Sequence, residues 1–497
     1  MATEDIRTYG NWRKPISPGI AGLGLAGTIV LFAGLLLVIF AMALSWLFAL
    51  VVAVLFSLAL IPLLLRDKHG RNGLQWATAR VSWAKGVTSG QHLYRSGPLG
   101  RVPLGTCKLP GLLAASKLYE AQDAYGRPFA HLHVPATNHH TVVITCNADG
   151  ASLVDPLQVE TWVAYWGNWL SQLGHEPSLV AASVTVEAAP DTGERLREEV
   201  YSNLVDDAPA LSKAVLAEVV DEYPSGSASL STRVALTYSG ASRTTGSKRT
   251  PEDVAVEIGT RLPGLCAGLQ MTGAGPARPM TGTELMEAVR IAYDPSVAVY
   301  IDKARAAGEG TGLTWDEAGP IAGEEAWGHY RHDDAFSVTW SMSEAPRGEV
   351  FSNVLSRLVS PHPDILRKRV TLLYRPHDPA TSSRLVERDR KDALFKARQT
   401  KTGNARDSVA VRAAEQAAHE EATGAGLVRF GMLVTATVGS AEEIKLAASA
   451  IDELSATARI LMRRVYGSQA GAFAAALPLG LVIPNHLKVP ATIREAM

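Results

Sequence analysis

Charged residues are missing from one long stretch of this chain. Between Ile20 and Leu65 the sequence contains no Asp, Glu, Lys, Arg or His. As a single helix this stretch would be about 69 Å long, whereas the hydrocarbon core of a bilayer is about 30 Å thick. The stretch 20–65 therefore predicts a two-helix transmembrane hairpin. A buried soluble hairpin is the alternative, and the length of the uncharged stretch disfavours it. We expect the spans near Ile20–Phe40 and Leu47–Leu65, with the turn within Ala41–Trp46.

Basic residues flank this stretch on both sides, and they predict its orientation. Arg7, Arg13 and Lys14 precede it, and Arg66, Lys68 and Arg71 follow it. Because positive residues collect on the cytoplasmic side of a membrane, both ends of the hairpin should face the cytoplasm. Residues 1–19 would then be a cytoplasmic tail, and both termini of the chain would be cytoplasmic.

Cysteine is scarce, and neither sign of charge is in surplus. The three cysteines, Cys107, Cys146 and Cys266, are widely spaced and odd in number, which argues against a disulfide framework and suits a reducing compartment. The chain has 48 Lys and Arg against 49 Asp and Glu. This balance gives no basis for a nucleic-acid-binding surface, so we expect no nucleic-acid partner.

Sequence motifs for catalysis are also missing. The nearest approach to a P-loop, Gly240–Lys248, has five residues between its glycines where the motif has four. The chain has no G-x-S-x-G or H-E-x-x-H pattern and no catalytic-cysteine pattern. We therefore predict no catalytic residue and no cofactor.

Two groups of side chains are candidate sites. His131 and His133 lie two apart on a predicted strand and share a face, as metal ligands can, but the spacing of a complete zinc site is missing, so structural histidines are the favoured interpretation. Trp162, Trp166 and Trp169 recur at helical spacing. They are candidates for an interface, although packing beneath a sheet is favoured.

The chain beyond the hairpin predicts an α+β fold with one topology repeated. Residues 66–135 are expected to form a small β-rich region, in which Leu74–Thr106 supplies short strands and turns. Residues 136–272 and 334–497 each show the order β-α-β-β-α of a ferredoxin-like split β-α-β unit. A connector, 273–333, separates these tandem units. In the first unit we expect strands at Thr141–Asn147, Leu179–Glu187, Ser231–Tyr238 and Gly268–Thr272, and helices at Pro156–Leu173, Thr192–Ser202, Ala208–Asp221 and Pro251–Ala267. In the second we expect strands at Ala335–Met342, Arg367–Arg375 and Leu427–Val438, and helices at Glu349–Ser360 and after Ser440.

A charged helical insertion interrupts the second unit. Residues 381–424 predict two antiparallel helices divided at Gly403–Asn404. Large apolar residues are few there, and Leu394 and Phe395 are two of them and the candidate contact residues of the arm. The arm is either a solvated surface or a contact with a partner or another copy of the chain.

Several sequence runs resemble known membrane components. The runs "LPGLLAASKL", "DAYGRPFAHLHVP" and "HTVVITCNADG" followed by "WLSQLGHEPSLVAASVTVE" resemble an uncharacterised actinobacterial family of two-span membrane proteins found beside conjugation or type IV-like secretion components. The strand–helix–"LGHEP"–strand portion is also similar to the EccE-type component of type VII secretion. The segment from "RVTLLYRP" to "GSQAGAFAAALPLG" resembles the N-terminal half of type IV secretion ATPases.

The resemblance implies a non-catalytic docking component of a bacterial secretion or conjugation apparatus, held in the cytoplasmic membrane. Its expected partners are the lipid bilayer, a secretion or conjugation ATPase and other membrane subunits. Because no Walker motif is present, no catalytic residue is carried over from the ATPases. The alternative is a membrane-bound enzyme facing the cytoplasm whose active site is too dispersed to form a motif.

Overall fold

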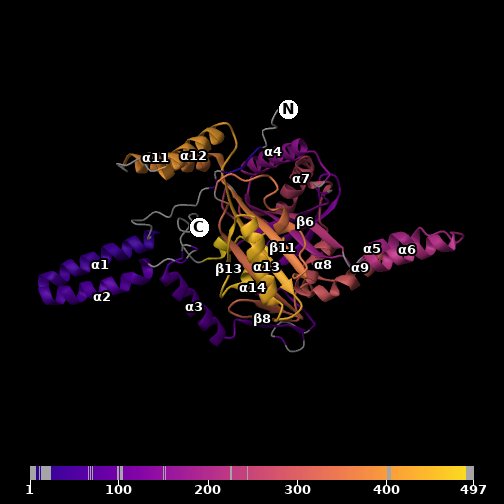
Figure 1. Ribbon diagram of the computed structural model, residues 1–497, viewed down its shortest axis with the longest axis horizontal. Helices are drawn as coiled ribbons and strands as arrows, with labels where there is room; N and C mark the ends of the chain where they lie inside the picture. The colour runs from indigo at the N-terminus through magenta and orange to yellow at the C-terminus, as the bar shows by residue number, and fades with distance from the viewer. Residues whose placement is uncertain are drawn as a thin grey trace.

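A pair of apolar helices and two further helical pairs project from a body built on one sheet (Figure 1). The structure is a computed structural model. It describes residues 7–10, 12, 24–64, 67, 69, 71–97, 100, 105–148, 150, 153–223, 227–242, 244–346, 348–399 and 405–487. Most of the tail 1–19 lies outside these ranges. Tyr9, however, forms an isolated bridge with Val350, donating its backbone N–H to the Val350 carbonyl at 2.8 Å.

Three helices lead into the body of the molecule. α1 (Gly24–Leu44) and α2 (Trp46–Leu64) lie side by side, and the break between them falls at Ser45, whose hydroxyl accepts a hydrogen bond from the Phe48 N–H. Among the described residues, one stretch within α1, Gly27–Leu44, is long and apolar enough to cross a membrane, and Trp46–Leu58 is a shorter apolar helical stretch. α3 (Gly73–Thr88) follows.

The described strands form one 13-stranded sheet in which every pairing is antiparallel. This confirms the mixed α and β composition that the sequence predicted. The main order is β1-β8-β9-β10-β12-β11-β5-β6-β4-β3-β2, with β13 also on β10 and β7 also on β4.

The sheet has two halves that meet where β5 pairs with β11. After β1 (Leu93–Arg95), the elements of the first half are β2 Lys117–Gln122, β3 Pro128–Val134, β4 His139–Cys146, α4 Pro156–Leu173, β5 Leu179–Pro190, α5 Glu194–Ser202, α6 Ala210–Glu222, β6 Ala228–Ser239, α7 Pro251–Leu269 and β7 Ala277–Pro279. Those that follow are α8 Gly282–Tyr293, α9 Ala298–Ala306, β8 Ala322–Glu325, β9 Tyr330–His332, β10 Ala335–Glu344, α10 Ser356–Val359, β11 Arg367–Pro376, α11 Pro379–Gln399, α12 Ala405–Ala422, β12 Val428–Val438, α13 Ile444–Thr457, β13 Leu461–Arg464 and α14 Gln469–Ala476.

Helices cover both faces of the sheet. On one face α4 and α7 pack over the first half and α10 and α13 over the second, with cores around Ile144 and Val434. On the other face α8 and α14 close a core that joins residues of both halves, including Leu132, Leu433 and Phe473. The alternation of strand side chains between the two faces explains why both are apolar.

The face beneath α14 and the segment after it also carries a buried polar layer. Pairs of hydroxyls bridge neighbouring strands, as in Thr185–Thr371 at 3.2 Å and Thr339–Thr435 at 2.9 Å. Thr371 Oγ1 donates to the Ala476 carbonyl at 2.7 Å, and Thr237 Oγ1 donates to the Gly480 carbonyl at 2.9 Å. Gly480 has φ of 64°, and a Cβ there would collide with the Thr237 hydroxyl, so this close approach requires glycine.

Four predictions of local structure are wrong. Of the stretch Leu74–Thr106, expected to be short strands and turns, residues 74–88 lie in α3, because Asn72 and Gln75 form a capping box at its start, and one strand, β1, follows. The helix expected over Glu349–Ser360 is reduced to α10, because Val350 instead forms a bridge with Tyr9 and the chain turns over residues 352–355 before α10 begins. The strand expected at Gly268–Thr272 is instead the end of α7 and a π-helical turn, Gln270–Ala274, and β7 follows it.

The fourth correction concerns the connector. Residues 273–333 do not separate two domains, because they contribute β7, β8 and β9 to the sheet and α8 to the core shared by both halves. The helical insertion, in contrast, forms as predicted, as α11 and α12.

Candidate functional site

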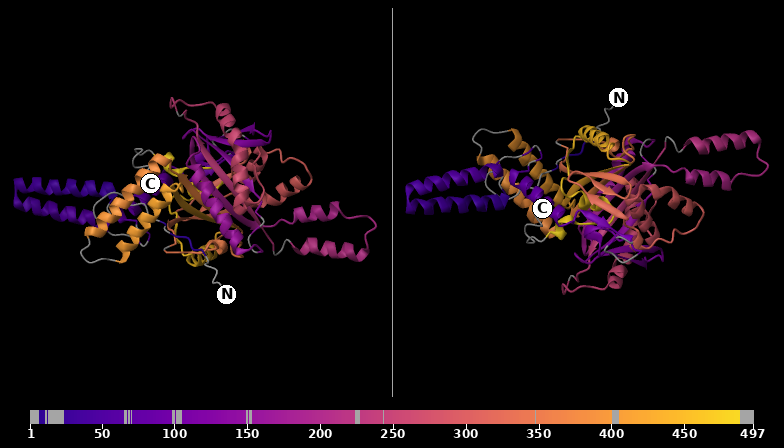
Figure 2. Two further views of the ribbon diagram at one scale, coloured as in Figure 1. Left: turned by 90° about the horizontal axis from the view of Figure 1, so that it is seen from above. Right: turned by 90° about the horizontal axis from the view of Figure 1, so that it is seen from below.

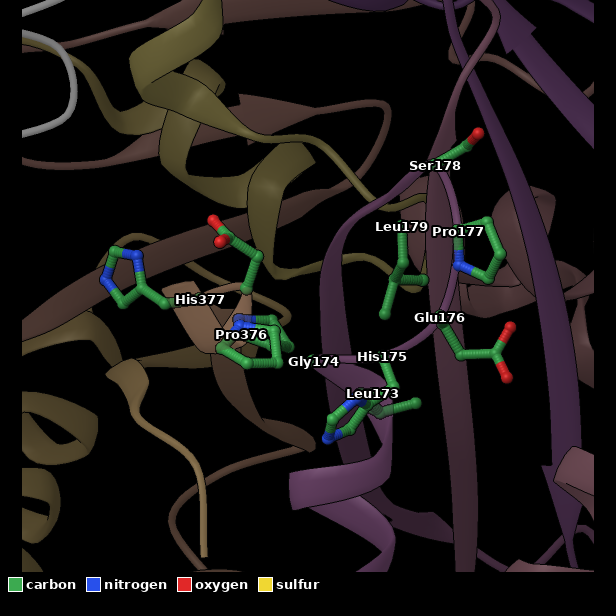
Figure 3. A pocket seen from close by; sticks show the side chains of 11 residues that line it. Leu173, Gly174, His175, Glu176, Pro177, Ser178, Leu179, Pro376 and His377 are labelled. Carbon is green, nitrogen blue, oxygen red and sulfur yellow. The ribbon is translucent and has the colours of Figure 1, made fainter. Parts of the chain in front are cut away.

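The loops at the junction of the two halves border a hollow of about 400 Å³ (Figure 3). One loop, Leu173–Leu179, joins α4 to β5, and the other, Pro376–Pro379, joins β11 to α11. The loops approach closely at Gly174, where a Cβ would lie 2.9 Å from the His377 carbonyl oxygen.

The polar groups of this hollow do not converge on one point. Glu176 and His377 extend to opposite sides of it (Figure 3). Glu176 pairs with Arg261 at 2.9 Å, and the Asp378 carboxylate accepts the Thr381 N–H at 3.0 Å at the start of α11. General acid–base catalysis needs such groups within hydrogen-bond reach of one substrate atom. The hollow is therefore a poor acid–base site, and these side chains hold the two loops.

The two predicted histidines do share a face, and a third histidine joins them. His133 on β3 lies directly opposite His140 on β4, and their rings stack with centroids 4.3 Å apart. The centroids of His131 and His140 are 5.3 Å apart. Burial, and then the neighbouring histidines, lower the pKa of His131 to about 4 and that of His140 to about 3. In the part of the chain that the structure describes, no group of three His, Cys, Asp or Glu side chains is placed to hold a metal ion.

A buried carboxylate with three arginines occupies the junction of β5 and β11. Glu187 lies 2.9 Å from Arg369, 3.2 Å from Arg233 and 3.3 Å from Arg367. Burial alone would raise the pKa of Glu187, but Arg369, Arg367 and Arg233 outweigh it and hold that pKa well below its usual range. The cluster ties three strands together across the junction. No sequence pattern indicated it, because its four residues meet only through the pairing of β5 with β6 and β11.

The predicted tryptophans face inward. Trp169 is buried and donates its indole N–H to the Leu265 carbonyl at 3.2 Å. Trp166 stacks on Trp169 at 5.2 Å, and Trp162 packs against the turn at Gly273. These contacts place the three indoles against α7, the turn that follows it and Tyr374 of β11.

The other predicted interface pair lies on α11. Leu394 is half-buried and Phe395 is 64% exposed. α11 and α12 pack mainly against each other, with Val386 and Ala414 buried on these helices. The arm lies on the side of the body from which α1 and α2 project (Figures 1 and 2).

One family model matches the chain. It is a domain of unknown function, DUF8461, and it matches residues 16–75. No curated protein matches the sequence. The matched residues contain α1, α2 and the start of α3, so the match falls on the apolar helices and every strand of the described sheet lies outside it.

The candidate functional feature that remains among the described residues is an exposed apolar surface. Large apolar side chains are exposed along α1 and α2, among them Leu36, Phe40 and Trp46, which are 65%, 72% and 69% exposed. Monomeric soluble proteins rarely expose contiguous apolar patches of more than a few hundred Å². Sequence reasoning found this surface, since it depends only on the run of uncharged residues.

Proposed function

We propose that this chain is a membrane-anchored, non-catalytic docking component of a bacterial secretion or conjugation apparatus. The observation that carries the proposal is the exposed apolar surface of α1 and α2. α1 has 21 residues and α2 has 19. At 1.5 Å per residue each is about 30 Å long, which matches the hydrocarbon core of a bilayer.

A bilayer would cover the apolar side chains that α1 and α2 leave exposed in the described structure. Burying one Leu or Phe side chain stabilises by about 1.5–3 kcal/mol, so exposing a double row of them to water would be strongly unfavourable. Both basic flanks then lie on the cytoplasmic side, because the chain crosses twice. The sheet and its helical arms would face the cytoplasm, in contact with a secretion or conjugation ATPase, other membrane subunits or further copies of the chain.

We further infer that each half of the sheet is a ferredoxin-like unit. The order β7-β4-β6-β5 corresponds to strands 4-1-3-2 of a split β-α-β motif, and β13-β10-β12-β11 repeats it. The two units would be joined through their second strands, β5 and β11. Both carry a helical pair between the second and third strands: α5–α6 in the first and α11–α12 in the second. Because β5 and β11 are antiparallel, these pairs leave the sheet at opposite ends.

A cytoplasm-facing enzyme with a dispersed site is the alternative function. A pocket in which acidic or histidine side chains converge would favour it. In the hollow of Figure 3 the acidic and histidine side chains point apart, and Glu176 and Asp378 bind Arg261 and the Thr381 N–H. The observations favour docking.

Cysteine labelling in intact cells tests the topology. We expect a membrane-impermeant maleimide to label Ser45→Cys, between α1 and α2, and to leave Ala2→Cys and Gly73→Cys unlabelled until the cells are permeabilised. The wild-type chain, whose cysteines all follow α2, gives the background. Labelling of Gly73→Cys in intact cells would refute the cytoplasmic orientation, and with it the proposed docking to a cytoplasmic ATPase.

A further inference from the structure

The helical pair α5–α6 projects from the body on the side opposite α1 and α2 (Figures 1 and 2). Its base is fixed by contacts with α9. Thr192 Oγ1 donates to Asp302 at 2.9 Å, and Lys303 lies 3.9 Å from Glu194. α9 is in turn held by Arg305, which pairs with the buried Glu287 at 2.6 Å. The arm is thus presented in a set direction.

α6 is apolar on a face that nothing in the described chain covers. Leu211, Val215, Val219 and Tyr223 recur every four residues and are 76%, 50%, 44% and 53% exposed. Leu216 is exposed beside them. Positions i, i+4, i+8 and i+12 form one row along a helix. A helix with such a row normally buries it, so α6 has the form of a helix that lacks a partner.

The charge of the arm is one-sided. Residues 194–223 contain eight acidic residues and three basic ones. The acidic residues are Glu194, Glu198, Glu199, Asp206, Asp207, Glu218, Asp221 and Glu222, and the basic ones are Arg195, Arg197 and Lys213. Of the basic residues, Lys213 donates to the Asp206 carbonyl at 2.7 Å. Glu218 and Glu222 lie three residues after Val215 and Val219, so carboxylates border the apolar row along one side.

We propose that this face of α6 binds a basic amphipathic helix of a partner protein. The partner's apolar row would pack on Val215 and Val219, and its Lys or Arg residues would meet Glu218 and Glu222. The inference rests on the proposed docking function and identifies one docking surface and the chemistry of its partner.

The charge and the position of the arm favour a basic helix over a second copy of the chain and over a bilayer surface. A second copy docked through the same arm would bring two acidic surfaces together, which is electrostatically unfavourable. A bilayer surface with anionic lipids would repel the arm, and the arm points away from α1 and α2. A basic helix satisfies both the apolar row and the carboxylates.

The test measures binding of a defined peptide to the full chain in phosphatidylcholine nanodiscs. The probe is a dye-labelled amphipathic Leu/Lys helix of about 18 residues, or five turns, followed by fluorescence anisotropy, with empty nanodiscs as blank. We expect saturable binding that weakens as salt is raised. The double variant Val215→Gln/Val219→Gln should bind about tenfold more weakly. Glu218→Gln/Glu222→Gln should weaken binding severalfold and flatten its salt dependence.

The matched control is Val256→Gln, the same substitution at an exposed valine on α7 outside the arm, which should bind as the wild type does. Circular dichroism of each variant shows whether α6 is retained. The proposal is overturned if the peptide does not saturate, if the double variant binds equally well, or if a Leu/Glu peptide binds as tightly. It is also overturned if Val215→Gln/Val219→Gln abolishes self-association of the chain, or binding to phosphatidylglycerol vesicles, in place of peptide binding. If the peptide binds but Gly73→Cys is labelled in intact cells, the docking surface is retained and only the cytoplasmic orientation is refuted.

Discussion

Buried ionisable side chains give this protein a pH dependence that can be traced to single residues. His140 is fully buried, and both of its ring nitrogens lack a hydrogen-bond partner in the described structure. Burial, followed by the charges of His133 and His131, lowers its pKa to about 3. His332 is equally buried between the Tyr293 carbonyl, 2.5 Å from Nδ1, and Ser337, 2.8 Å from Nε2, and burial lowers its pKa to about 4.

These shifts predict loss of stability in mild acid. In the unfolded chain a histidine takes up a proton below about pH 6.5, whereas folded His140 stays neutral down to about pH 3. The unfolded state therefore binds more protons than the folded state between these pH values. The free energy of unfolding consequently decreases as the pH falls. Each such histidine lowers the free energy of unfolding by up to about 1.4 kcal/mol per pH unit in this window, and adds no pH dependence above it.

His140→Phe tests this at one position. The ring shape is kept while the titrating nitrogens are removed, so we expect stability at pH 7 to equal or exceed that of the wild type. The free energy of unfolding, measured in urea by tryptophan fluorescence at several pH values, should fall less steeply from pH 6 to pH 4.5. The same change at the exposed His419 should leave the slope as it is. An unchanged slope in His140→Phe would contradict the assignment.

Residue patterns located the elements where local chemistry decides the structure. Asp155 and Pro156 predicted the start of α4, and in the structure Asp155 accepts the Leu157 N–H at 2.8 Å. Met432, Val434, Ala436 and Val438 alternate within the strand predicted at Leu427–Val438, and all four are buried in one core. The prediction missed α3 although its capping box is a local signal, and it missed the short strands that tertiary pairing defines. β7, β8 and β9 have only three or four residues each, too few for a periodic pattern.

The candidate sites also differ in whether the sequence could predict them. The exposed apolar surface of α1 and α2 follows from composition alone. The cluster of Glu187 with its three arginines does not, because the pairing of β5 with β11 links residues some 180 positions apart. His140 was equally hidden, since its place opposite His133 depends on strand register.

The arm α11–α12 should be dispensable for folding. Its helices pack mainly on each other, and ordering about 40 residues costs on the order of 1–2 kcal/mol per residue before hydrogen bonding and burial offset it. Ser382 at its base is fully buried and its hydroxyl donates to the His377 carbonyl at 3.4 Å. A replacement that spares this contact should therefore span residues 383–422.

We expect a short Gly/Ser loop in place of residues 383–422 to keep the melting temperature within a few degrees of the wild type. Co-purification of a partner ATPase or of other copies should weaken, since Phe395 and the rest of the exposed arm are lost. Phe395→Ser in the intact arm serves as the milder comparison. Unfolding of the whole body by the deletion would show that the arm belongs to the core.

At the scale of the molecule, the two halves are joined in a way that the domain prediction did not anticipate. β5 and β11 pair over seven residues, from Ala188 with Lys368 to Ala182 with Tyr374. The core under α8 and α14 draws Leu132 and Val143 from one half and Leu433 and Phe473 from the other. Tandem units that were only linked through the connector would share neither the sheet nor the core.

We therefore expect the two halves to unfold together. Hydrogen exchange measured by mass spectrometry should give the same opening free energy for peptides of β4 and of β12. Glu187→Gln leaves three arginines at the junction without their carboxylate, and breaking a buried ion pair in this way costs about 3–5 kcal/mol. That variant should lower protection in both strands by the same amount, whereas Glu199→Gln on the exposed surface of α5 should lower neither. If Glu187→Gln exposes β12 while β4 keeps its protection, the halves are independent domains and the shared core contributes little to their cohesion.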